Sequence, residues 1–450
     1  MVNFGKTLGL ETFEDKVGNV IIKKPATSGM EDRQTVIMQS HLDMVHQKNN
    51  DTQFDFDTQG IDMFVDGDWV KAKGTTLGAD NGIGVATIMA ILESTTISHP
   101  AIEALFTIDE ETGMTGAKGL EGGLLTGDIL LNLDTEEDDE IGVGCAGGVD
   151  VTAIRSYNEE ETPEFKTGYK ITVKGLQGGH SGMDIHKGFG NANKLMNRLL
   201  FDGFENFGLR ISEIDGGSLR NAIPRESRAI VVIDAMSEAA FHSEMDEIIE
   251  AIKTEYKTLE PNLTIEVTKV DTPKMMMDLG VQEGFTRALY AACNGVYRMS
   301  PDIPDLVETS NNIARVIVKD GEIKIACLTR SSVETSKWDL ANMLRATFEL
   351  TGCEVEFDGD YPGWKPDMDS NILKVLSTLY KEMNGKEAHV AACHAGLECG
   401  ILGQNYPNME MISFGPNIKG AHSPDERVQI SSVQKYWKFV LEILKNIPKK

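Results

Sequence analysis

Short apolar runs that end in acidic residues or histidine constrain this chain more than any other feature. Three such runs, "TVIMQS" (35–40), "EALFTI" (103–108) and "DILLNL" (128–133), alternate with stretches of helical periodicity between residues 34 and 150. Runs of this length and composition are typical of buried strands, and their alternation with helices favours parallel pairing. We therefore predict an α/β fold with a mixed, mostly parallel central sheet.

A helix is expected between the first two of these strands. The segment "NGIGVATIMAILES" (81–94) carries apolar residues at helical spacing and follows directly after Asp80. Aspartate is a preferred N-cap residue because its carboxylate accepts hydrogen bonds from the first backbone amides of a helix. We therefore expect Asp80 to cap this helix.

The middle of the chain has a different pattern. Strands with polar alternation, such as "GYKITVKG" (168–175), are followed by the hairpin "ARVIVKDGEIKIACLTR" (314–330), in which Asp-Gly is a strong turn signal. Apolar runs of the first kind return near the C-terminus. We infer that residues 151–360 form an α+β domain inserted into a discontinuous domain of residues 1–150 and 361–450.

The charge balance opposes two classes of partner. The chain has 70 Asp and Glu against 43 Lys and Arg, a formal net charge of −27, which disfavours binding to nucleic acid or to anionic membranes. The first twenty residues do not resemble a secretory signal, no apolar stretch is long enough to span a bilayer, and the six cysteines include no CxxC pair. We expect a soluble cytoplasmic protein that acts on small molecules.

Side chains that could bind a metal gather at the predicted strand and helix boundaries. They are His41, Asp43, Asp80, Glu110, Glu111, Asp134 and His422. Because ligands of open α/β sheets bind outside the carboxyl ends of the strands, we expect these groups to converge. Each one alone has a commoner structural explanation, but those explanations would have to hold at five separate places. Carboxylates and imidazoles without cysteine suit Zn²⁺ or a similar divalent ion.

Counting ligands divides this group. Two metal ions that share one carboxylate need a bridging acid, together with one histidine and one further acid for each ion. Asp80 is the expected bridge. The two remaining pairs are His41 with Asp134, and His422 with Glu111.

One acid of "DEETG" then remains without a metal to bind. We expect Glu110 to act as the general base that takes a proton from the water activated by the two ions. Asp43, two residues after His41, is expected to accept the other ring N–H and so to orient the imidazole. Asp109 receives no role.

The same motifs resemble those of the M20 metallopeptidase family. "SHLDMV", "TTLGADNGIG", "DEETG", "LD" (133–134) and "GAHSPDE" match its metal-site motifs in order, and the resemblance runs from start to end of the chain. "GCAGG", "GGHSGMDIHKGFGNANK", "LRNAIPRE" and "HAGLECG" are closer still to its dipeptidases. The resemblance implies a di-zinc enzyme, with Mn²⁺ or Co²⁺ as substitutes, that hydrolyses dipeptides with free termini, including Xaa-His dipeptides such as β-alanyl-histidine.

The resemblance also implies a catalytic domain with an inserted lid that contributes to the site. His180 in "GGHSG" would hydrogen-bond the developing oxyanion. Asn221 and Arg330 would bind the C-terminal carboxylate of the substrate, an anion whose shape a guanidinium matches. His394 and Glu398 in "HAGLECG" would line the pocket. A homodimer through the lid is compatible with this, and whether His180 acts within one chain or across the dimer stays open.

Three alternatives remain open. The first is another M20-type amidohydrolase, such as an N-acyl amino acid deacylase or a tripeptidase. The second is a non-catalytic binding protein that keeps the fold, against which the presence of Glu110 and every ligand argues; the third is a single-metal enzyme. Family members also carry a further segment before the part that matches "MVNFGKTLGLE", so reduced stability and activity are expected if its loss uncovers an apolar face.

Overall fold

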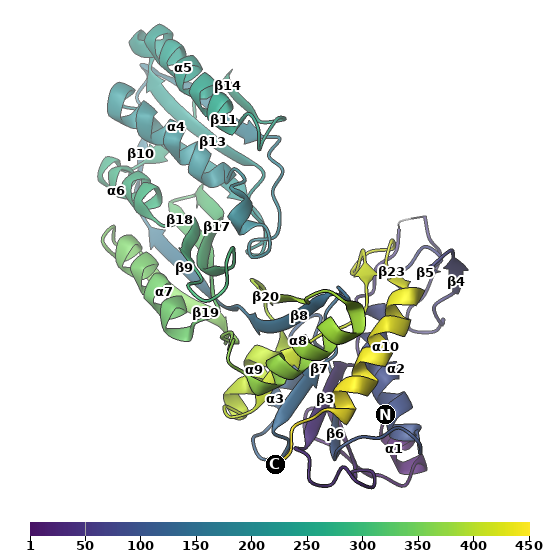
Figure 1. Ribbon diagram of the computed structural model, residues 1–450. Coiled ribbons are helices and arrows are strands. Elements are labelled where there is room, and N and C mark those ends of the chain that lie inside the picture. The colour runs from purple at the N-terminus through teal and green to yellow at the C-terminus, as the bar shows by residue number, and fades with distance from the viewer. Residues whose placement is uncertain (50) are drawn as a thin grey trace. The chain divides into compact units, whose positions relative to one another are not determined.

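The protein is described from a computed structural model that covers residues 1–49 and 51–450. The chain divides into two compact units (Figure 1). The first unit contains Met1–Cys145, Trp364–Cys393 and Leu397–Lys450, and the second contains Ala146–Gly363 and His394–Gly396. The second unit is therefore inserted in the chain of the first. No helix within the described ranges is long and apolar enough to cross a membrane.

The first unit is built on an eight-stranded sheet with the order β1-β2-β6-β3-β7-β21-β8-β20. β3 pairs in parallel with β6 and β7, β7 with β21, and β8 with β20, whereas the other pairs are antiparallel. The bounds are β1 (Glu11–Glu14), β2 (Val20–Lys24), β3 (Val36–His41), β6 (Ile102–Thr107), β7 (Ile129–Asn132), β8 (Glu140–Cys145), β20 (His389–Cys393) and β21 (Glu410–Ser413). The predicted mixed, mostly parallel sheet is confirmed, and its first three predicted strands are correct to within one residue at each end.

Burial on both faces explains why the central strands are apolar runs rather than alternating ones. Every residue of β3, β6 and β7 is buried. On one face, Ile37, Leu105 and Leu130, one from each strand, join a cluster with Ala117 and Leu402. These last two residues belong to α3 (Thr115–Gly119) and α9 (Glu398–Asn405), which therefore cover this face.

A separate four-stranded sheet in the first unit has the order β22-β23-β5-β4. It joins the C-terminal hairpin of β22 (Ile418–Lys419) and β23 (Arg427–Gln429) to β5 (Trp69–Ala72) and β4 (Met63–Asp66). The loop of that hairpin contains His422. This sheet therefore brings a C-terminal loop beside the segment that leads into the helix α2 (Ala79–Glu93).

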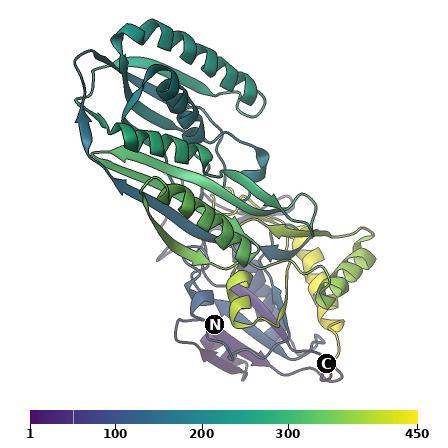
Figure 2. The same ribbon diagram turned by 90° about the vertical axis from the view of Figure 1, so that its left-hand side faces the viewer.

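The second unit is an antiparallel nine-stranded sheet with one row of helices packed on it (Figure 2). Each helix contacts the next in the order α5, α4, α6, α7, and all four contribute to one apolar core with the sheet. The predicted hairpin is confirmed, because β17 and β18 are joined through Asp320 and Gly321, both with positive φ. The helices and hairpin strands are α4 (Ala192–Phe207), α5 (Glu238–Tyr256), α6 (Leu279–Ala291), α7 (Glu334–Glu349), β17 (Val307–Lys319) and β18 (Glu322–Ser331). The predicted α+β class of this region is also confirmed.

Candidate metal centre

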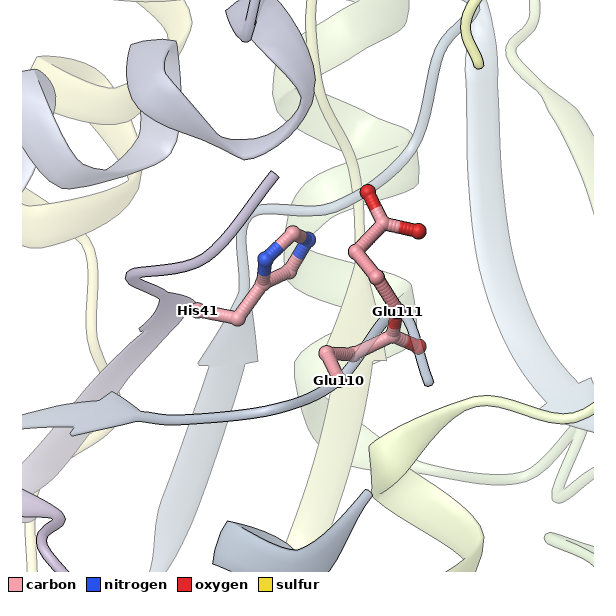
Figure 3. Close-up of side chains that lie close together, drawn as sticks. All are labelled: His41, Glu110 and Glu111. Atoms are coloured by element: carbon pink, nitrogen blue, oxygen red, sulfur yellow. The ribbon is translucent and has the colours of Figure 1, made fainter. Parts of the chain in front are cut away.

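The predicted metal ligands lie together beyond the carboxyl ends of the central strands. They form overlapping triplets in which one ligand atom from each residue lies within 4.8 Å of the others. Two triplets share Asp80, and the third joins the end of β3 to the segment after β6 (Figure 3). The triplets are His41, Asp80 and Asp134; Asp80, Glu111 and His422; and His41, Glu110 and Glu111.

Asp80 stands between the two histidines. Its Oδ1 lies 3.2 Å from Nε2 of His41, and its Oδ2 lies 3.2 Å from Nε2 of His422. Nε2 of His41 is also 3.5 Å from Oδ1 of Asp134, and Nε2 of His422 is 3.0 Å from Oε2 of Glu111. Each imidazole therefore faces Asp80 and one further carboxylate through the same nitrogen.

The carboxylates of this group outnumber the histidines that could offset their negative charge. Burial, reinforced by the charge of Asp134, raises the pKa of Glu110 to about 9. Burial likewise raises the pKa of Asp134 to about 6. Among the described residues, Oε1 of Glu111 is buried and has no hydrogen-bond partner. A divalent cation would offset the repulsion and give that oxygen a partner, so the residues present fit a metal site.

Asp43 connects His41 to the segment that carries the two glutamates. Nδ1 of His41 donates to the backbone carbonyl of Asp43 at 3.0 Å, with the Asp43 carboxylate at 3.5 Å. That carboxylate accepts the backbone amides of Glu110 and Glu111, each at 3.1 Å. Burial opposes its ionisation, but the bonds from His41 and the two amides outweigh burial and lower the pKa of Asp43 to about 2. The hydrogen bond to the carbonyl requires a proton on Nδ1 of His41, and Nε2 is the nitrogen that faces Asp80.

The prediction that Asp80 caps the following helix is wrong. α2 begins at Ala79, its N-cap is Gly78 at φ 72°, and Asp80 itself has non-helical backbone angles. The first amides of the helix instead donate to the carboxylate of Glu426. Because another residue satisfies those amides, the carboxylate of Asp80 is free to contact both histidines.

A buried polar network lies beside the metal-binding group. Oε2 of Glu398 accepts Nε2 of Gln39 at 2.6 Å and Oγ1 of Thr107 at 2.7 Å, and Nδ2 of Asn132 donates to Gln39 at 2.5 Å. Glu398 is fully buried, which raises its pKa to about 7. The sequence predicts that Glu398 lines the pocket with His394 and predicts no role for Gln39. The missed signal is a glutamine inside an otherwise apolar strand, "TVIMQS".

His180 lies in the second unit, in the loop after β11 (Lys166–Lys174). Its Nδ1 accepts the backbone amides of Gly182 at 3.2 Å and Met183 at 3.0 Å, so the proton of the neutral ring is on Nε2. Burial and the charge of Arg330 lower the pKa of His180, which favours this neutral form. The ring therefore presents an N–H donor at Nε2.

The other predicted residues of the second unit differ in exposure. Arg330 is 4% exposed, and its Nη1 donates to the hydroxyl of Tyr361 at 2.7 Å. Its Nε is buried and has no hydrogen-bond partner in the described part of the chain. Nε2 of His394 is 2.7 Å from the hydroxyl of Ser310, and burial lowers the pKa of His394 to about 3. Asn221 is exposed. The buried Nε–H of Arg330 is therefore a donor that a bound anion would satisfy.

Comparisons with known proteins identify the family of the chain. Residues 37–446 match the model of peptidase family M20/M25/M40. The chain is 44% identical over 450 residues to the cytosol non-specific dipeptidase of Escherichia coli (strain K12), covering 100% of this chain and 93% of that protein. It is 45% identical to aminoacylhistidine dipeptidase from Vibrio alginolyticus, whose crystal structure matches with a TM-score of 0.94 over 100% of this chain and 92% of that one.

A more distant structure shows the same fold. The aminopeptidase PepT from Bacillus cereus is 17% identical and matches with a TM-score of 0.56, covering 99% of this chain and 91% of that chain. The family predicted from the sequence motifs and the predicted fold class are both confirmed. This chain belongs to peptidase family M20/M25/M40 and is a hydrolase of that family.

Proposed function

We propose that this protein is a di-zinc dipeptidase that hydrolyses dipeptides with free termini, including Xaa-His dipeptides such as β-alanyl-histidine. The observation that carries the proposal is the position of Asp80 between two histidines, each of which faces one further acid, with Glu110 left over. The full-length similarity to two proteins named dipeptidases supports the substrate class.

In this proposal His41 with Asp134 would hold one zinc ion, His422 with Glu111 would hold the other, and Asp80 would be shared by both. Mn²⁺ and Co²⁺ accept the same ligands and are the expected substitutes. Bound zinc ions polarise the scissile carbonyl and lower the pKa of water toward about 7.

Glu110 is the proposed general base. One of its carboxylate oxygens takes the proton of the attacking water and then gives it to the leaving amine, so the glutamate carries the proton between two steps. Burial and the charge of Asp134 raise the pKa of Glu110, and two cations bound beside it would lower that pKa and so favour the carboxylate that a general base requires. The hydrogen bond from its amide to Asp43 orients the segment that bears it.

The second unit would bind the rest of the substrate. Nε2–H of His180 donates to the oxyanion that develops on the carbonyl, a task for which a neutral ring with its proton on Nε2 is suited. Arg330 and Asn221 bind the C-terminal carboxylate, and His394 lines the pocket beside them. The unpaired Nε of buried Arg330 supports the carboxylate assignment. In the proposal an acid of the metal site also meets the free amine, and the two requirements together restrict the enzyme to dipeptides.

The same proposal assigns the regions of the chain. Residues 1–150 and 361–450 form the catalytic domain and residues 151–360 form the lid, through which two chains associate as a homodimer. We place the protein in the cytoplasm, which agrees with the name of the Escherichia coli relative. The substrate is a zwitterion that local charges recognise, because the net charge of −27 repels anions in general.

The test is hydrolysis of a panel containing Xaa-His, Gly-Gly, a tripeptide and an N-acetyl amino acid by zinc-loaded protein. We expect cleavage of the free dipeptides alone, and its loss in Glu110→Gln with both zinc ions still bound. Glu121→Gln, a change at an exposed glutamate of the same unit, is the matched control and should keep full activity. Turnover of only the acetylated substrate would replace the proposal with a deacylase, and turnover of only the tripeptide with a tripeptidase.

A further inference from the structure

Glu426 is a buried carboxylate in the loop between β22 and β23, four residues after His422. It is 2% exposed, and no lysine, arginine or histidine forms an ion pair with it among the residues the structure describes. Its two oxygens instead accept four consecutive backbone amides. They are those of Leu77 (2.6 Å), Gly78 (3.0 Å), Ala79 (2.8 Å) and Asp80 (3.3 Å).

The amides of Ala79 and Asp80 are the first two of α2 and have no partner within the helix, and those of Leu77 and the N-cap residue Gly78 come directly before them. Orphan amides at a helix start carry partial positive charge, so a carboxylate that accepts several of them is strongly bound. One of the four belongs to Asp80, whose non-helical backbone angles are thereby held by a side chain from another part of the chain. Glu426 therefore holds the backbone from which the side chain of Asp80 extends.

The same contact holds the loop of His422. The His422 side chain is 54% exposed, so few contacts of its own fix it, yet its Nε2 lies 3.2 Å from Asp80 and 3.0 Å from Glu111. Apolar packing of Leu77 and Ala79 with the hairpin brings the two segments together. Such packing is non-directional, whereas four amides on one carboxylate specify a single alignment.

We propose that Glu426 is a positioning residue that aligns the His422 loop with the start of α2 and so sets the geometry between His422 and Asp80. The inference rests on the proposed function, because it assumes that both residues bind metal. Glu426 touches neither metal nor substrate; it acts through the backbone of one ligand and the loop of the other.

The test is Co²⁺ titration of metal-free protein, followed through the visible d–d absorption, for wild type and Glu426→Gln. Glutamine places an NH₂ group against amide donors and loses half of the acceptors. We expect Glu426→Gln to weaken binding of one Co²⁺ about 10- to 100-fold and to change the absorption spectrum, as loss of supporting contacts does at metal sites. Glu426→Asp, which keeps the charge with a shorter reach, should restore part of the affinity.

Glu103→Gln is the matched control. Glu103 is also a buried carboxylate of the first unit that accepts backbone amides, those of Thr126 and Gly127, and it is not part of any metal-binding triplet. Its loss should lower stability but leave Co²⁺ affinity and the spectrum unchanged. Equal Co²⁺ affinity and identical spectra for wild type and Glu426→Gln would overturn the inference.

The outcomes separate this inference from the proposed activity. If wild type binds two Co²⁺ but cleaves no dipeptide, the proposed function fails. The Co²⁺ titration then still tests whether Glu426 positions the metal ligands. If wild type cleaves dipeptides and Glu426→Gln binds metal normally, only the positioning role fails. Should Glu426→Gln not fold by circular dichroism, Glu426→Asp decides the question, and wild-type affinity in that variant counts against the inference.

Discussion

The backbone amide of Glu110 donates a hydrogen bond of 3.1 Å to the carboxylate of Asp43. The other oxygen of the same carboxylate holds the amide of Glu111, and the backbone carbonyl of Asp43 holds the ring of His41. A single aspartate thus fixes a proposed base and two proposed ligands relative to one another. Its contribution should appear in the rate of reaction rather than in substrate binding.

We expect Asp43→Ala to lower kcat for a dipeptide by about 10- to 100-fold with little change in KM, because supporting contacts of metal ligands contribute effects of this size. Steady-state kinetics with parallel metal analysis measures both quantities. Asp278→Ala is the control: Asp278 also accepts a backbone amide, that of Val281 at 2.9 Å, but at the start of α6. The role assigned to Asp43 would be contradicted by equal kcat values for the two variants.

The tautomer of His180 predicts different results for two amide substitutions. His180→Gln can place an N–H donor near the position of Nε2, whereas His180→Asn can replace only the acceptor that Gly182 and Met183 use. We expect kcat to fall by about 10²- to 10³-fold in His180→Asn, the usual effect of losing one oxyanion donor, and by less in His180→Gln. Equal kcat for His180→Asn and wild type would remove His180 from the reaction.

Arg330→Met should raise KM for free dipeptides by about 10- to 100-fold. Hydrogen bonds to a charged group contribute about 1.5–3 kcal/mol, and each 1.4 kcal/mol corresponds to about tenfold in affinity. A C-terminally amidated dipeptide supplies the internal control, since it lacks the carboxylate and should be cleaved equally poorly by both proteins. If the substitution raised KM for the amide and the free dipeptide alike, Arg330 would not bind the carboxylate.

Glu103 predicts how stability depends on pH. Burial opposes its ionisation, but bonds from Thr126 and from Lys23, whose Nζ lies 3.0 Å away, outweigh burial and lower the pKa of Glu103 below its usual 4.5. Because the unfolded chain binds the proton more readily, the stabilisation is complete above the unfolded-state pKa and is lost as the pH falls through the lowered folded-state value.

Glu103→Gln is therefore expected to lower the free energy of unfolding by about 1–3 kcal/mol at neutral pH and by less near pH 3. Urea unfolding of both proteins across this range, with a chelator present to exclude metal effects, measures the difference. A difference that stays constant or grows on acidification would show that the charge of Glu103 does not stabilise the fold.

Much of the fold could be predicted because local sequence decides it. The run 35–40 is apolar on both faces, and this pattern indicates a strand that is buried on both sides of a sheet. The turn at Asp320 and Gly321 requires residues that tolerate positive φ, which makes the hairpin recognisable. The predicted ligands could be found for a related reason: histidine and acids at several strand ends are costly unless something compensates them.

Contacts between distant parts of the chain could not be predicted in this way. Aspartate before an apolar helical pattern normally caps the helix, yet Glu426, 346 residues further on, takes the amide of Asp80. Nothing near Glu426 in the sequence indicates which amides it will meet. Gln39 is different, since a lone amide side chain in an apolar strand must find a buried partner, and Glu398 provides it.

The strand order of the first unit has a consequence for how the protein is made. β21 lies between β7 and β8 although it follows β8 and the whole of the second unit in the chain. A ribosome therefore produces the strands on both sides before it produces the strand that joins them, and His422 emerges later still. The metal-binding triplet of Asp80, Glu111 and His422 cannot be assembled before His422 has been synthesised. A growing chain thus acquires its complete site only after His422 has been made, and products that stop before that residue are left without it.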